Sequence, residues 1–221
     1  MYIIDILRNG ILSYVVCDSG ILDENGSSRL EMIRAKNIEV KENIQLGTNV
    51  VLVGGALTKV AEYLESNYLD VLIMNGGFVG ANIVPVDEVL SKFKDKEVVR
   101  TYNFNLDVEA TDKVLRSYNV GRFILVGKNV CHSEKNTVSG VWSDEEKFLA
   151  QFDIAPKKRL HDLLAAHDGL SRAGLIEDEP HCLFECVYPF NEGLIGNMTK
   201  WGSSKTKTEY RQVEAAISWF E

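Results

Sequence analysis

The stretch from Asn49 to Gly77, NVVLVGGALTKVAEYLESNYLDVLIMNGG, predicts a strand, a helix and a second strand in succession. Its two strand candidates, Asn49–Val53 and Val71–Met74, are continuous apolar runs, which are typical of strands covered on both faces. Between them, apolar residues in Leu57–Asn67 recur at the spacing of an amphipathic helix. A helix that joins two such strands indicates a parallel pair.

The same alternation of strand and helix patterns continues through the rest of the chain. A helix is expected after the capping residue Asp107, and a third buried strand at Phe123–Val126. Further elements are expected as a helix at Leu160–Ala166, a strand at Cys182–Val187 and a terminal helix at Tyr210–Phe220. We therefore predict an α/β protein with one domain over residues 1–221, built on a mostly parallel open sheet with helices on both faces.

The composition of the chain excludes several functional classes. Of its 221 residues, 45% are hydrophobic and 25% are charged, as in ordinary globular domains. The formal net charge of −8 argues against a nucleic-acid-binding surface, which needs clustered Lys and Arg. No apolar run reaches the ~20 residues of a membrane helix, and Asp5 and Arg8 interrupt any signal-peptide pattern. The sequence thus predicts a cytoplasmic protein that binds neither nucleic acid nor membrane.

The four cysteines form no C-x-x-C pair, so neither a zinc ribbon nor a redox motif is indicated. His181, Cys182 and Cys186 stand close together, but within a strand pattern. We interpret them as buried sulfur and a strand-end histidine, with metal ligation as the alternative.

Three asparagines follow expected strands or begin the elements after them: Asn75, Asn82 and Asn103. An amide both donates and accepts hydrogen bonds, so such groups suit a polyhydroxylated ligand such as a sugar. The alternative is that each asparagine only supports a turn.

Two His–Asp pairs, His161-Asp162 and His167-Asp168, fall in or near the expected helix at Leu160–Ala166. On a helix surface such a pair is usually just solvated. Either pair could instead bring a carboxylate and an imidazole to the same site.

Four blocks of sequence stand in order at the ends of expected strands and helices: GALTKVA at 55–61, VLIMNGGF at 71–78 with GANIVP at 80–85, YNFNLDVEA at 102–110 and ILVGKNVCH at 124–132. They resemble the GPLTNxA, MGGAF…GNxxP, EFNxxxDPEAA and LVGLDVTH motifs of the inosine-uridine preferring nucleoside hydrolase family. The resemblance covers about residues 46–135 well and the remainder loosely.

The resemblance implies a nucleoside hydrolase-like fold and hydrolysis of an N-ribosyl bond through an oxocarbenium-like transition state. In that family a calcium ion, held mainly by an amino-terminal DxDxxxDD motif, orients the attacking water. Asn82 and Asn103 match the two ribose-binding asparagines of the family. Gly54 falls where the family uses a backbone carbonyl as a calcium ligand.

His161-Asp162 resembles the family's HDPLA motif, which implies Asp162 as the last calcium carboxylate and His161 as an acid for the leaving base. Asp168 of the second pair is the alternative carboxylate. Thr101 replaces the ribose-binding glutamate of the family, two positions before Asn103.

The chain also departs from the family pattern. It is much shorter, and it lacks the DxDxxxDD motif, since residues 1–25 offer only the aspartates Asp5, Asp18 and Asp23. Because calcium takes about 6 to 8 oxygen ligands, this scarcity predicts a weakly bound ion.

Two functional hypotheses follow, an N-glycosyl hydrolase of nucleosides or related ribosyl compounds and a non-catalytic relative that binds a nucleoside, a sugar or a protein partner. In both cases a homo-oligomer is expected, because shortening exposes surface that must be covered.

Overall fold

The computed structural model describes residues 14–16, 39–137, 159–195 and 198–221. The chain divides into two compact units, Met1–Thr48 and Asn49–Glu221. In the first unit, strand β1 (Val15–Val16) pairs in parallel with β2 (Val40–Lys41).

Four adjacent parallel strands form the core of the second unit: β3 (Val50–Val53), β4 (Leu69–Asn75), β6 (Val120–Val126) and β9 (Val213–Trp219). Val53 pairs with Met74, and Met74 pairs with Leu125. The expectation that the first three apolar runs are neighbouring parallel strands is therefore confirmed. The apolar side chains of β4 and β6 are buried, as the continuous apolar pattern predicts. Those of β3 are only half-buried, because β3 lies at the edge of the sheet and is not covered as the pattern predicts.

The remaining three strands are antiparallel and complete a seven-stranded sheet in the order β3-β4-β6-β9-β7-β8-β5. They are β7 (Cys182–Ile195), β8 (Met198–Ser204) and β5 (Val98–Arg100). The long β7 pairs with β9 through Cys182–Val187 and with β8 from Tyr188 onward. The sheet is thus mixed, with its parallel half at β3 to β9.

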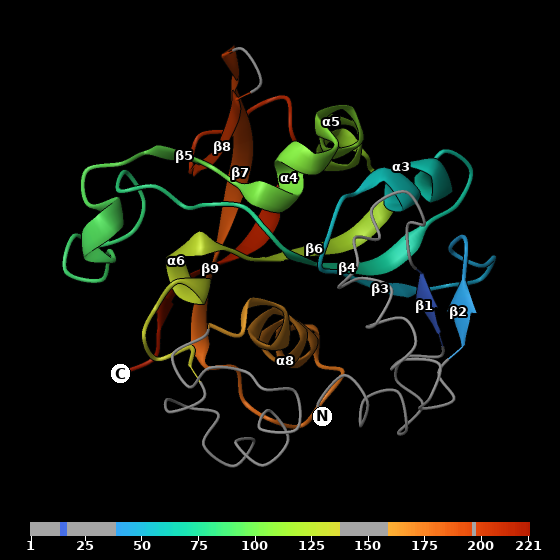
Figure 1. Ribbon diagram of the computed structural model, residues 1–221, viewed down its shortest axis with the longest axis horizontal. Coiled ribbons are helices and arrows are strands. Elements are labelled where there is room, and N and C mark those ends of the chain that lie inside the picture. The colour runs from blue at the N-terminus through green and yellow to red at the C-terminus, as the bar shows by residue number, and fades with distance from the viewer. Residues whose placement is uncertain (1–13, 17–38, 138–158, 196–197) are drawn as a thin grey trace, which may run out of the picture. The chain divides into compact units, whose positions relative to one another are not determined.

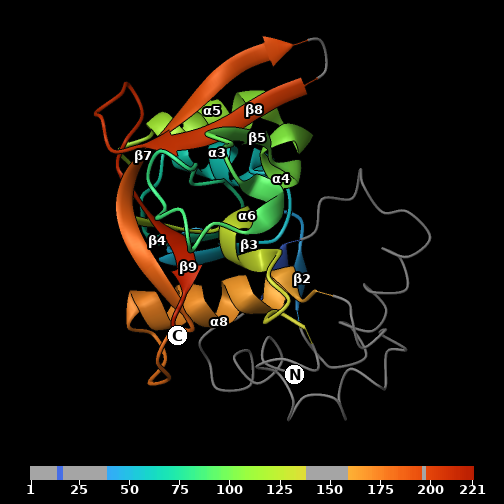
Figure 2. The same ribbon diagram turned by 90° about the vertical axis from the view of Figure 1, so that its left-hand side faces the viewer.

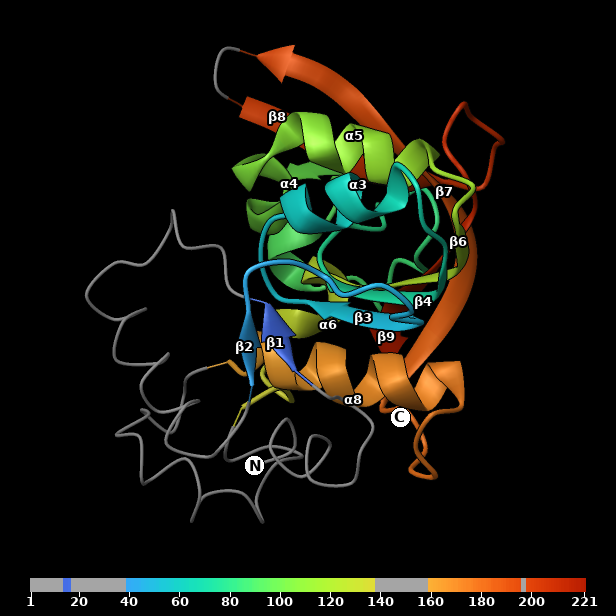
Figure 3. The ribbon, with the colours of Figure 1, turned by 90° about the vertical axis from the view of Figure 1, so that its right-hand side faces the viewer.

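Helices cover both faces of the parallel half, as expected (Figures 1 and 3). On one face lie α3 (Thr58–Leu64), α4 (Tyr102–Leu106) and α5 (Val108–Arg116). On the other face α8 (His161–Ala173) packs against β4 and β6. Figure 2 shows α8 running beneath the strands, close to the short helix α6 (Lys128–Cys131). A 3-10 turn, η1 (Ser91–Phe93), precedes β5.

Asp107 caps α5, as the sequence predicts. Its Oδ1 accepts a hydrogen bond from the Ala110 amide at 3.0 Å, and its Oδ2 accepts one from Thr58 Oγ1 at 2.7 Å. The same side chain therefore caps the start of α5 and ties it to the start of α3.

The terminal helix expected at Tyr210–Phe220 is wrong, because this segment contains strand β9. Val213 and the run Ala215–Ser218 are buried, which leaves no polar helix face. A segment that lies between β6 and β7 has neighbours on both sides, so its backbone is satisfied by the sheet and local helical spacing does not decide its structure. In the described part of the chain, no helix is long and apolar enough to span a membrane.

Candidate functional site

Polar side chains meet where the first two parallel strands end. Asn75 is the last residue of β4, Gly54 directly follows β3, and Asp162 lies in the first turn of α8. Asn75 Nδ2 donates a hydrogen bond to Asp162 Oδ1 at 2.7 Å. A Cβ atom on Gly54 would lie only 2.9 Å from the same oxygen, so glycine is what lets the carboxylate approach the loop after β3.

Asn103, in the first turn of α4, joins this group from the other side. Its Nδ2 donates to the backbone carbonyl of Asn75 at 2.7 Å. We call this group of four residues the Asp162 cluster: Gly54, Asn75, Asn103 and Asp162. Asp162 is exposed and the two asparagines are half-buried, so a carboxylate and amides are open to a ligand at the edge where parallel sheets bind one.

His161 adjoins the Asp162 cluster and faces a second imidazole. The ring centroids of His161 and His132 lie 4.9 Å apart, and His161 Nε2 is buried without a hydrogen-bond partner in the described part of the chain. Burial lowers the pKa of His161, an effect that the Asp162 carboxylate opposes and Arg159 adds to. This imidazole is therefore neutral near pH 7 and can accept a proton.

The two other expected site residues lie outside the hydrogen bonds that build the Asp162 cluster. Asn82 is exposed, and its Nδ2 contacts the Ser203 carbonyl at 3.5 Å. Thr101 is buried before α4, and its carbonyl accepts from Asn105 Nδ2 at 2.6 Å. Thr101 Oγ1 has no hydrogen-bond partner among the described residues.

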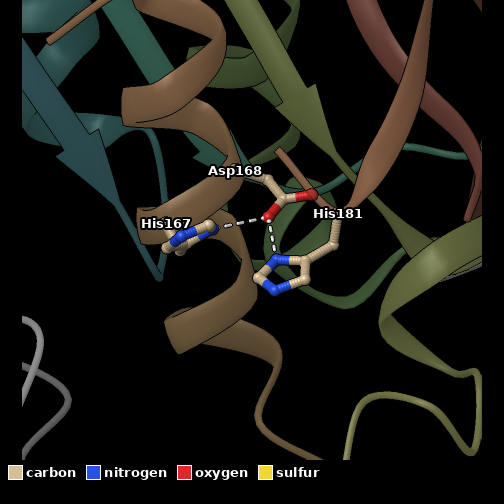
Figure 4. A group of neighbouring side chains, drawn as sticks. All are labelled: His167, Asp168 and His181. Atoms are coloured by element: carbon tan, nitrogen blue, oxygen red, sulfur yellow. Dashed lines mark hydrogen bonds and ion pairs between the residues drawn. The ribbon is translucent and has the colours of Figure 1, made fainter. Parts of the chain in front are cut away.

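Asp168, the alternative to Asp162, belongs to a separate, buried group (Figure 4). The Nδ1 atoms of His167 and His181 lie 2.8 and 2.9 Å from Asp168 Oδ1. The side chain of Asp168 is fully buried, about 1.7 turns of α8 beyond the exposed Asp162. The structure thus brings Asp162, and not Asp168, to Asn75 and Asn103.

The environment of Asp168 keeps it ionised. Burial acts to raise its pKa, but hydrogen bonds from His167, His181 and Cys182 outweigh this and lower the pKa to about 2. Burial and the Asp168 charge raise the pKa of the Cys182 thiol, which is inert as a nucleophile for that reason.

The same group offers the ligand types that transition metals prefer. His167, Asp168 and His181 each offer one ligand atom, and these three atoms lie within 4.8 Å of one another. No other group of three potential metal ligands lies as close together in the described ranges. Their mutual hydrogen bonds already account for the buried carboxylate oxygen Oδ1. Of the cysteines that the sequence places near His181, Cys182 is buried as expected and Cys186 is exposed.

Asn129 is a positioning residue that the sequence did not single out. It is buried at 8% exposure, and its amide accepts from the Val79 backbone N–H at 2.8 Å and donates to the Val79 carbonyl at 2.6 Å. These two bonds fix the loop that follows Asn75. The sequence does mark this position, because Asn129 stands in the ILVGKNVCH block where the similar LVGLDVTH motif has an aspartate.

The described residues of the Asp162 cluster do not complete a calcium site. They offer the Asp162 carboxylate, the side-chain oxygens of Asn75 and Asn103 and the Gly54 carbonyl, fewer oxygens than the roughly 6 to 8 that calcium takes. Moreover, Asn75 presents its Nδ2 donor to Asp162. The aspartates of the amino-terminal region lie outside the described residues: Asp5, Asp18 and Asp23.

A pocket of about 420 Å³ lies at the amino ends of the parallel strands, near the start of β6 and β9. Its guanidinium groups are already engaged, since Arg122 pairs with Glu214 at 2.8 Å and Arg211 donates to backbone carbonyls. We therefore place the candidate site at the carboxyl ends of the strands, where ligands of such sheets bind.

Comparisons with known proteins give one relative and no family. No family model matches the chain, and no solved structure matches it. An uncharacterized protein of Aquifex aeolicus (strain VF5) is 26% identical over 167 residues, which cover 72% of this chain. The match covers 56% of that relative, so the chain spans about half its length.

Proposed function

We propose that this chain is a nucleoside hydrolase-like protein whose Asp162 cluster binds the ribose of a nucleoside or a related ribosyl compound and supports hydrolysis of its N-glycosyl bond. The observation that carries the proposal is the 2.7 Å bond from Asn75 to Asp162, which holds a carboxylate beside amides at the carboxyl ends of β3 and β4. The sequence blocks support it, because they supply the helix that follows Gly54, as well as Asn75 and Asn103.

The chemistry of these side chains suits a ribosyl ligand. Amides of Asn75 and Asn103 can donate to and accept from vicinal hydroxyls. The Asp162 carboxylate would stabilise the positive charge that develops on the sugar, or accept a proton from the attacking water. The neutral His161 imidazole stands next in the chain and can exchange a proton with the leaving base.

A second candidate function is binding without hydrolysis. Binding without hydrolysis is favoured because, among the described residues, Asp162 is the one carboxylate of the cluster. General acid–base help by one carboxylate contributes roughly 100- to 10,000-fold, which is far below a full hydrolase rate enhancement. We therefore expect weak turnover of ordinary nucleosides.

The test is turnover and binding of inosine and uridine by the full chain, with and without added calcium. Asp162→Ala should lower turnover by roughly 100-fold or more, because the charge-stabilising group is lost. Asp70→Ala is the matched control, since Asp70 is exposed at the opposite end of β4 and should leave turnover unchanged.

Binding that depends on Asp162 without any turnover would select the second candidate. A wild-type chain that neither binds nor hydrolyses nucleosides would refute both.

A further inference from the structure

Cationic side chains gather beside the Asp162 cluster, although the chain as a whole carries a net charge of −8. They come from four separate segments: Lys92 in η1, Arg100 at the end of β5, Lys128 at the start of α6 and Arg159 just before α8. Lys128 and Arg159 are half-buried. Segments far apart in the chain thus bring positive charge to one edge of the sheet.

Aromatic contacts fix the position of this cation group. The His132 ring packs edge-on against Phe93, with centroids 5.7 Å apart, and lies 4.9 Å from the His161 ring. Lys92 Nζ lies 4.9 Å from the centroid of Phe93. Through these rings, η1 and α6 are held against the start of α8.

Among the residues that the structure describes, these cations, Lys92, Arg100, Lys128 and Arg159, have no ion-pair partner. Arg159 Nε, like His161 Nε2, is buried with no hydrogen-bond partner there. Burial lowers the pKa of Lys92 and of Lys128, and the neighbouring cations lower both further. Unpaired, partly desolvated cations with open donors are an unfavourable arrangement unless an anion completes it.

The cation group is continuous with the Asp162 cluster. His161 and Asp162 are adjacent, and Cys131 Sγ lies 3.8 Å from Asn75 Oδ1 and 3.9 Å from the His161 carbonyl. The two groups are therefore neighbours at the start of α8.

We propose that the ribosyl ligand of the Asp162 cluster carries a phosphate monoester, which binds among Lys92, Lys128 and Arg159. The ligand class is then a nucleoside monophosphate or a sugar phosphate and not an unmodified nucleoside. The binding of the sugar by the Asp162 cluster rests on the proposed function. The binding of the phosphate rests on the cation group alone. Arg supplies forked donors for phosphate oxygens, and Lys supplies point charges.

The test is calorimetric titration of the full chain with four probes: uridine, uridine 5′-monophosphate, ribose 5-phosphate and inorganic phosphate. Uridine 5′-monophosphate should bind at least roughly tenfold more tightly than uridine, because charge-assisted hydrogen bonds add to the affinity. This advantage should shrink as salt rises. It should disappear in the double variant Lys92→Ala/Lys128→Ala and persist in Lys113→Ala, whose lysine pairs with Glu109 on α5.

Thermal unfolding of each variant shows that it is folded. Equal affinities for uridine and its monophosphate, or an advantage that survives the double variant, would overturn the proposal.

Asp162→Ala separates the two proposals. If it leaves the affinity for uridine 5′-monophosphate unchanged while the double lysine variant abolishes binding, the phosphate site stands and the proposed function fails. If it weakens the binding of uridine and its monophosphate alike, with no advantage for the monophosphate, the proposed function stands and the phosphate site fails.

Discussion

Asp162 and Asp168 illustrate how little a local motif determines. Both follow a histidine in the same helix, six positions apart, and the sequence alone left both as candidate carboxylates. Their partners come from distant segments, since Asn75 donates to Asp162 and His181 to Asp168. No spacing rule on α8 could have shown which aspartate meets the ends of the strands.

Asp168 should contribute strongly to stability near neutral pH. Its pKa is lowered from 3.8 to about 2, so the folded chain gains stability above pH 4 that it loses as the pH falls toward 2. At 1.36 kcal/mol per unit, the contribution is on the order of 2 kcal/mol. Asp168→Asn should lower the free energy of unfolding by about that amount at pH 7, as measured by urea denaturation.

Asp70→Asn is the control for this measurement and should change the free energy of unfolding by less than ~0.5 kcal/mol, because Asp70 is exposed. The difference between Asp168→Asn and the wild type should shrink between pH 4 and pH 2. A difference that stays constant over this range would show that the Asp168 charge is not its cause.

His132 should report on an anion bound by the cation group. Its pKa is lowered to about 4, first by burial and then by Lys92, His161, Lys128 and Arg159. A bound phosphate opposes these positive charges and favours the protonated ring. An NMR titration of the His132 ring should therefore give a higher pKa with uridine 5′-monophosphate than without it, whereas an unchanged value would argue against phosphate at this position.

At the scale of elements, the apolar runs of the parallel strands and the strand at Cys182–Val187 were predictable, whereas β5, β8 and β9 were not. β3, β4 and β6 are read from continuous apolar stretches, and α5 from its cap at Asp107. β9 carries the same kind of buried surface with helical spacing, so only its place between β6 and β7 decides its structure. β8 contains a glycine and pairs with the strand just before it, β7. The short β5 pairs with β8, a partner far along the chain that local spacing cannot show.

The contact of α8 with β4 depends on Gly169. A Cβ atom there would lie 2.2 Å from Ile73 Cγ2, in a fully buried part of the interface. Overpacking costs about 1–3 kcal/mol, which outweighs the gain of up to ~1 kcal/mol from replacing glycine in a helix. Gly169→Ala should therefore lower the midpoint of thermal unfolding.

Gly55→Ala is the matched control for Gly169→Ala, because a Cβ atom at Gly55 would meet nothing within 4 Å. Its unfolding midpoint should stay close to that of the wild type. Equal or higher stability of Gly169→Ala would mean that α8 does not pack this tightly on β4.

At the scale of the whole molecule, the candidate site residues lie at one end of the parallel strands. The Asp162 cluster lies where β3 and β4 end, and Lys128 of the cation group lies just after β6, as the general rule for open α/β sheets predicts from the order of elements. The cation group as a whole was not predictable, because Lys92, Lys128 and Arg159 are separated in sequence by up to 67 positions and only Lys128 lies in one of the four sequence blocks. Their meeting is a consequence of the fold.

We predict that the chain forms a homodimer. β3 and β5 end the seven-stranded sheet, and the backbone groups of an edge strand can pair with a second chain. Large apolar side chains such as Tyr102 and Tyr118 are also exposed, at 70% and 84%. Light scattering at micromolar concentration should give twice the mass of the chain, and a monomer mass would contradict the prediction.

The central claim, that the Asp162 cluster binds a ribosyl ligand, is tested most directly by the side-chain amide resonances of Asn75 and Asn103. We expect both pairs of resonances to shift together during titration with uridine 5′-monophosphate and to follow one binding curve. The amide of Asn119, which donates to the Leu64 carbonyl at the other end of the sheet, should not move. If the Asn75 and Asn103 resonances stay unchanged at saturating ligand, the cluster is not the ribosyl site.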